Sequence, residues 1–139
     1  MKELIEIIDN ITKYGLRTDL NVKNKEKDLE QNLVRLYSKY FDIDYEFDEK
    51  DYPDFDKNLY PQIIENIQKN FPDFGFYHSF LNTNEIFNEA ETGTGVAVDD
   101  LSHIINDILE VKWRFENTSE ADGLWYFDFI FYCHTHQHL

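Results

Sequence analysis

The sequence predicts an all-α fold, in which residues 1–139 form a single helical bundle of about five helices with an irregular acidic and aromatic connection. Apolar residues recur at helical spacing in several segments, and glycine, proline and capping residues separate those segments. Hydrophobic residues make up 42% of the chain and aromatic residues 17%, which argues against disorder despite the large charge. A chain of 139 residues is also long enough to bury one core.

The first two helices are expected at residues 2–14 and 25–40, packed antiparallel. In residues 2–14, apolar residues recur at helical spacing at Leu4, Ile7, Ile8 and Ile11, and Gly15 is expected to end the helix. The second shows the same spacing at Leu29, Leu33, Leu36, Tyr37 and Tyr40.

The segment "FDIDYEFDEKDYPDFD", residues 41–56, interleaves carboxylates with aromatic rings and predicts the irregular connection. The alternation of carboxylates and aromatic residues leaves an edge strand as an alternative, although the charge and Pro53 weigh against one. A third helix is expected over residues 58–70, with Ile64, Ile67 and Phe71 on one side. Proline and glycine then punctuate "FPDFGFYHSFLN", residues 71–82, which predicts a packed loop or a short helical turn.

A fourth helix is predicted from about residue 96 to residue 111, and a fifth from near Glu120 to the chain end. The apolar stripe of the fourth is Ala97, Leu101, Ile104 and Ile108. Ser119 is the expected cap of the fifth, with Asp122 three residues on. The run "LWYFDFIFYC", residues 124–133, also has strand propensity, but the local cap and the length of the run favour a helix.

The charge of the chain bounds the classes of partner it can bind. Acidic residues outnumber basic residues 28 to 13, and a formal net charge of −15 disfavours binding to nucleic acid or to an anionic membrane surface. Such charge fits either a basic protein partner or simple solubility. The amino terminus has neither a signal-like nor a membrane-spanning run, and the single Cys133 excludes an internal disulfide, so a cytoplasmic protein is expected. Cys133 itself is interpreted as a small buried hydrophobe.

Motifs for the common catalytic chemistries are absent from the sequence. The segment "ETGTGV" has the glycines of a phosphate-binding loop without its lysine, so it is interpreted as a turn. Cys133 beside His134 is adjacency in sequence and does not indicate a nucleophile with its base. No catalytic residue is therefore assigned, and a non-catalytic protein is expected.

Aspartates and histidines in the last two predicted helices form one candidate site. A rotation of about 100° per residue places four polar residues on one side of the fourth helix: Asp99, Asp100, His103 and Asp107. The same count places His134 and His138 on the face of Leu124, Phe127 and Phe131, and turns His136 away.

Two interpretations of this cluster stay open. A divalent transition metal, such as zinc, iron or manganese, fits a shell of Asp100, Asp107, His134 and His138, with Asp99 or His103 outside it. Alternatively, the two histidines are an inward pair hydrogen-bonded to the aspartates, which ties the two helices together without any ion.

The favoured functional hypothesis is a protein-binding module, in the style of small acidic immunity proteins that neutralise basic toxins. Aromatic anchors among carboxylates suit recognition of a basic surface. The expected partner surface is Phe41, Asp44, Tyr45, Phe47, Asp51, Tyr52, Asp54 and Phe55.

The second half of the chain resembles the bacterial domain of unknown function 5063 in "FPDFGFYHSFL", "DDLSHIINDI" and "LWYFDFIFYCHTHQH". The resemblance implies a mostly helical bacterial domain without an established activity. The residues of this chain that match the family pattern are Asp99, Asp100, Asp107, His134 and His138. Family members tend to have Asp at the position of His103 and Trp-Gly at residues 135–136, so those positions inherit no role.

Overall fold

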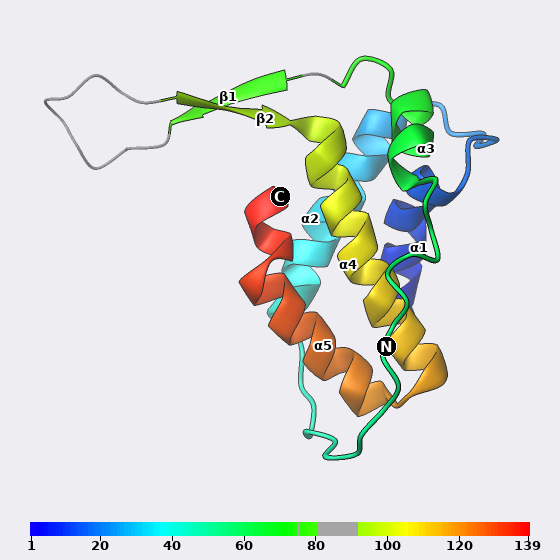
Figure 1. Ribbon diagram of the computed structural model, residues 1–139, viewed down its shortest axis with the longest axis vertical. Coiled ribbons are helices and arrows are strands. Elements are labelled where there is room, and N and C mark those ends of the chain that lie inside the picture. The colour runs from blue at the N-terminus through cyan, green and yellow to red at the C-terminus, as the bar shows by residue number, and fades with distance from the viewer. Residues whose placement is uncertain (75, 81–91) are drawn as a thin grey trace, which may run out of the picture.

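The computed structural model describes residues 1–74, 76–80 and 92–139, and it confirms the predicted bundle of five α-helices (Figure 1). The helices in chain order are α1 (Lys2–Leu16), α2 (Lys25–Tyr40), α3 (Ile63–Asn70), α4 (Ala97–Asn117) and α5 (Glu120–Cys133), and a 3₁₀ turn, η1 (Thr135–His138), follows them. None of the described helices is long and apolar enough to cross a membrane.

The core lies where α1 contacts α2, α3 and α4. The predicted apolar stripes of α1 and α4 are its centre, and Ile8, Ile11 and Ile108 are fully buried. Full burial of one such side chain stabilises a fold by about 1.5–3 kcal/mol, so this interface dominates the stability of the bundle. Gly15 does not stop α1 as predicted, because the helix continues to Leu16 and packs the glycine closely against α3 and α4.

The predicted ends of α3 and α4 need correction. α3 begins at Ile63 instead of Asn58, because Asp56 holds a turn by accepting a hydrogen bond from the backbone N–H of Asn58 at 2.9 Å. Ile63 is buried in consequence, whereas Ile64 is exposed. α4 continues six residues past the end predicted from its apolar stripe, through a charged segment whose side chains are paired.

α5 is a helix, so the strand alternative for residues 124–133 is wrong and the capping prediction is confirmed. The hydroxyl oxygen of Ser119 accepts a hydrogen bond from the backbone N–H of Asp122 at 3.1 Å. α5 packs along α4, and Gly123 allows the close approach, because a Cβ there would lie only 2.6 Å from the ring of Phe115.

A two-stranded antiparallel ribbon stands beside the bundle, where a loop and a turn were predicted. β1 (Phe76–Phe80) pairs with β2 (Thr92–Val96), with Phe76 opposite Val96, and the ribbon extends away from the helices (Figure 1). Pairing with each other gives both segments backbone hydrogen bonds that neither segment forms alone. Because the two strands are separated in the sequence, the pattern of neither segment predicts this pairing. Residues 81 and 82 of the predicted loop lie outside the described residues.

Candidate metal centre

Histidines from two elements meet where the C-terminal turn packs against α4. α5 ends at Cys133 because His134 has φ of −142° and ψ of −57°, which is not helical. The prediction of one helix running to the chain end is therefore wrong. The 3₁₀ turn that replaces it still places His138 beside His134, with the two rings 4.7 Å apart.

The imidazoles of His134 and His138 face each other through their Nε2 atoms, which are 3.2 Å apart. Each ring is held from behind by a carboxylate on α4. The Nδ1 of His134 donates to Asp107 at 2.7 Å, and the Nδ1 of His138 donates to Asp100 at 2.8 Å. The hydroxyl of Thr135 also donates to Asp107, at 2.8 Å, so the start of η1 is fixed to the same carboxylate.

His103 completes the cluster from α4. Its ring stacks on that of His138 with centroids 4.6 Å apart and meets that of His134 edge-on at 5.3 Å. His103, His134 and His138 each offer one nitrogen, and these nitrogens all lie within 4.8 Å of one another. The side chains of His103 and His134 are 43% and 36% exposed, so an ion at this place would be open to solvent on one side.

The arrangement agrees with one of the two interpretations of the sequence and differs in part from the other. Asp100 and Asp107 accept hydrogen bonds from the histidines, as the hydrogen-bonded interpretation expects, whereas the metal interpretation made these aspartates ligands. His103 was expected in the outer shell, and one of its nitrogens lies within 4.8 Å of nitrogens of both His134 and His138. Asp99 keeps an outer position, 3.5 Å from the Nε2 of His103. Helical counting found these residues but could not tell which atoms meet.

The carboxylates determine where the imidazoles carry their protons. An ionised carboxylate only accepts hydrogen bonds, so the Nδ1 of both His134 and His138 carries a proton. In the neutral imidazole the remaining lone pair is then on Nε2. Two lone pairs facing each other at 3.2 Å repel unless a cation lies between them. A metal ion bound by both nitrogens would remove this repulsion.

The other residues of the C-terminal turn are peripheral to this cluster. His136 is exposed, as predicted, and its Nδ1 lies 2.9 Å from the backbone oxygen of Phe131. Cys133 is exposed, so the prediction of a small buried hydrophobe is wrong. It falls on the outward side of the last turn of α5, whereas Phe127 and Phe131 fill the inward side.

The predicted partner surface at residues 41–56 is partly used within the molecule. Tyr45 donates to Asp128 on α5 at 3.0 Å, Phe55 packs edge-on against Trp113 on α4, and Tyr52 donates to Asp48. The contacts of Tyr45 and Phe55 fasten the connection to the α4 and α5 pair, whereas that of Tyr52 lies within the connection. The predicted surface residues that stay exposed are Phe41, Asp44, Phe47, Asp51 and Asp54.

Asp48 links this connection to the start of α5, and the link is expected to weaken in acid. Hydrogen bonds from the hydroxyls of Ser119 and Tyr52 and from the backbone N–H of Lys50 lower the pKa of Asp48 from 3.8 to about 2. Because the pKa is lower in the folded state, the stabilisation is complete above about pH 4 and is lost as the pH falls towards 2. Urea unfolding between these pH values should show a smaller acid loss of stability for Asp48→Asn than for the wild type. Asp51→Asn, a change of an exposed residue in the same segment, should lose as much stability in acid as the wild type. Equal stability profiles for both variants would contradict the assignment of this acid sensitivity to Asp48.

The fold and the cluster define a small acidic helical bundle with a histidine site at its C-terminal turn. Comparison of the chain with protein-family models, with curated proteins and with solved structures gave no match. The resemblance to the bacterial domain of unknown function 5063 therefore stays a prediction, and the chemistry of the cluster is the guide to function.

Proposed function

We propose that the protein binds one divalent transition metal ion between α4 and η1, through His103, His134 and His138. The observation that carries the proposal is the pair of Nε2 atoms 3.2 Å apart, each on a ring whose Nδ1 is already held by a carboxylate. Zinc binds imidazole nitrogen at about 2.0–2.1 Å, so two ligands in a tetrahedral shell lie about 3.3–3.4 Å apart. The spacing of the pair is close to that value.

The chemistry of the donor set favours a zinc-like ion. Imidazole nitrogens suit zinc, copper, iron and nickel, whereas calcium and magnesium prefer a shell of oxygen atoms. Carboxylates hydrogen-bonded to the far side of ligating histidines fix the ring orientation and make the ligand nitrogen more basic. Asp107 and Asp100 are placed for that role behind His134 and His138.

Such a site would have both a structural and a chemical consequence. An ion held by His103 on α4 and by His134 and His138 at the C-terminal turn would fasten that turn to the bundle. Three protein ligands leave a fourth position of a tetrahedral shell for water, and zinc makes a bound water more acidic. The partial exposure of His103 and His134 supports access to that position.

Metal titration of the untagged protein tests the proposal, because a histidine tag would bind metal by itself. We expect one Zn²⁺ per chain by isothermal titration calorimetry, and the visible bands of tetrahedral coordination when Co²⁺ is added instead. Free zinc at about 100 times the dissociation constant should raise the free energy of unfolding by about 2.7 kcal/mol. Absence of saturable binding would reject the site and leave the other interpretation of the sequence, in which the histidine pair is hydrogen-bonded to the aspartates and ties the two helices together without an ion.

A further inference from the structure

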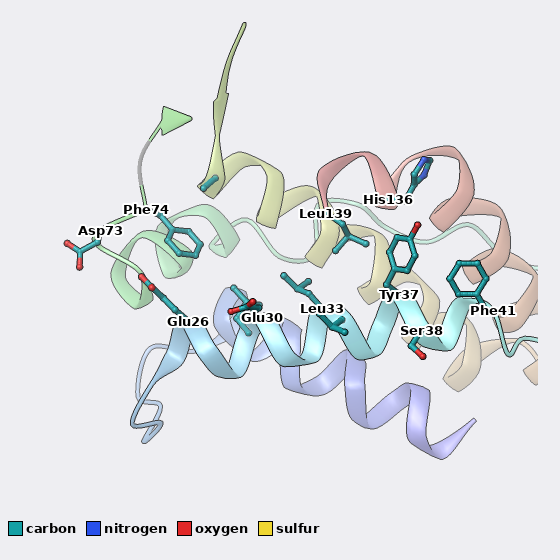
Figure 2. A pocket seen from close by; sticks show the side chains of 13 residues that line it. Glu26, Glu30, Leu33, Tyr37, Ser38, Phe41, Asp73, Phe74, His136 and Leu139 are labelled. Carbon is teal, nitrogen blue, oxygen red and sulfur yellow. The ribbon is translucent and has the colours of Figure 1, made fainter. Parts of the chain in front are cut away.

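An apolar groove runs along the outer face of α2, apart from the nitrogens of the histidine cluster. It encloses about 1090 Å³ between α2, the segment before β1 and the chain end (Figure 2). Most of its lining residues come from α2, and Asp73, Phe74, His136 and Leu139 are among the others.

The groove exposes large apolar side chains in one contiguous row. Val34 is 64% exposed, Tyr37 45% and Phe41 69%, and all three come from α2. The opposite face of this helix is occupied, because Leu29 and Leu36 are buried in the core. Apolar side chains that are exposed together on one helix face, instead of scattered singly, are typical of a binding surface.

Acidic residues occupy one end of the groove. Glu26 and Asp73 lie beside Phe74, with Glu30 next along α2, whereas Phe41 and His136 lie at the far end (Figure 2). All three carboxylates are exposed, and none forms an ion pair with another described residue. The described lining residues include no lysine or arginine, so the local charge is unopposed within the groove.

The dimensions of the groove match a helix. The lining residues of α2 run from Glu26 to Phe41, which is about 22 Å at a rise of 1.5 Å per residue. Leu33, Tyr37 and Phe41 follow one another at intervals of four, so they form a single ridge that the apolar face of a second helix can pack against.

We propose that this groove binds an amphipathic helix of a partner protein, with lysine or arginine residues at the end that lies against Glu26, Glu30 and Asp73. Apolar contact along α2 would supply most of the affinity, while the charged end would fix the direction of the helix and speed association. The net charge of −15 favours the same partner over nucleic acid or an anionic membrane. This surface is distinct from the partner surface predicted at residues 41–56, although Phe41 belongs to both.

Fluorescence anisotropy with designed peptides tests the proposal, in a buffer with chelator so that the outcome is independent of metal binding. The probes are two labelled amphipathic helices of about 16 residues, with leucines along one face and lysines at either the amino or the carboxyl end. We expect saturable binding of one of them at micromolar concentration. The same peptide with glutamate for lysine, and a scrambled peptide without an apolar face, should bind at least about tenfold more weakly.

Variants of exposed residues locate the binding. Val34→Glu, and the double change Glu26→Lys with Glu30→Lys, should each weaken binding by about tenfold or more. Glu46→Lys with Glu49→Lys makes the same charge change at exposed positions outside the groove and should leave binding nearly unchanged. Circular dichroism confirms that each variant is folded.

Three results would overturn the proposal. Equal losses in the two charge-reversed proteins would show attraction to net charge alone, and failure of both lysine peptides to bind would exclude the proposed helix. A dimer in sedimentation that Val34→Glu dissociates would assign the groove to a second copy of the chain instead.

Discussion

Arg114→Met is expected to lower the free energy of unfolding by about 3–5 kcal/mol, the largest effect of any single change considered for this protein. Arg114 bridges two carboxylates on the inner side of the α4 and α5 pair. Its Nη2 lies 2.9 Å from Glu110, and its Nη1 lies 3.0 Å from Asp122. The side chains of both acids are only 9% exposed. Methionine would fill similar space but leave two like charges buried without a counterion.

The surrounding groups show how closely this network is built. The hydroxyl of Tyr126 donates to the second oxygen of Glu110 at 2.8 Å, and the guanidinium of Arg114 lies over the ring of Tyr126 at 4.4 Å. Burial opposes the charge of Arg114, but the hydrogen bonds to Glu110 and Asp122 outweigh it and raise the pKa of Arg114. Burial and the hydrogen bond to Glu110 raise the pKa of Tyr126. The arginine therefore stays charged throughout the pH range in which the protein is folded.

Urea unfolding followed by circular dichroism measures this effect, and two further variants separate charge from packing. Arg114→Lys should lose less stability than Arg114→Met, because an ammonium keeps the charge but cannot reach both acids with a planar fork. Adding Glu110→Gln and Asp122→Asn to Arg114→Met should recover part of the loss, since no uncompensated charge then remains. A loss below about 1 kcal/mol for Arg114→Met would show that water already screens the network.

The second large effect is on metal binding, where His138→Ala is expected to weaken zinc affinity by more than about 100-fold. Removal of His138 takes away one of the two nitrogens that face each other at 3.2 Å. It also frees the chain end, because His138 is the residue that joins the end of η1 to Asp100. Competition with a chromophoric chelator measures the affinity of the variant and of the wild type under the same conditions.

Two matched variants define the reason for the loss. His136→Ala removes a histidine of the same turn that lies outside the cluster, and zinc affinity should not change. Asp107→Asn keeps all three nitrogens but alters the group that orients His134, so a reduction of about 10–100-fold is expected. Equal affinities for His136→Ala and His138→Ala would contradict the assignment of the site, even if the wild type binds zinc.

Much of the fold could be predicted because its signals are local. The apolar periodicity of α1, α2 and α4 identified these helices, and the cap at Ser119 correctly indicated that α5 is a helix. The sequence-based predictions were wrong where groups far apart in the sequence determine the local structure. β1 and β2 form by pairing with each other. α4 extends beyond its apolar stripe through residues such as Arg114, which pairs with Asp122 on the next helix.

The candidate site divides in the same way. Helical counting brought Asp100, Asp107, His134 and His138 to one region, because side chains one turn apart share a face. It could not predict that the helix ends at Cys133, nor that the carboxylates would hold Nδ1 atoms while the ring of His103 packed against both imidazoles. Those features depend on the packing of η1 against α4, which is a contact between segments far apart in the sequence.

By itself, therefore, the sequence determined that this chain is a strongly acidic, mostly helical domain, and it identified the residues that gather near the chain end. Composition and periodicity are properties of short segments, and they survive in any arrangement of the helices. Only the tertiary structure decided which nitrogens face one another and which side of α2 stays uncovered. Both outcomes follow from how the helices pack, because packing alone decides which polar atoms come within bonding distance and which apolar surface is left in contact with water.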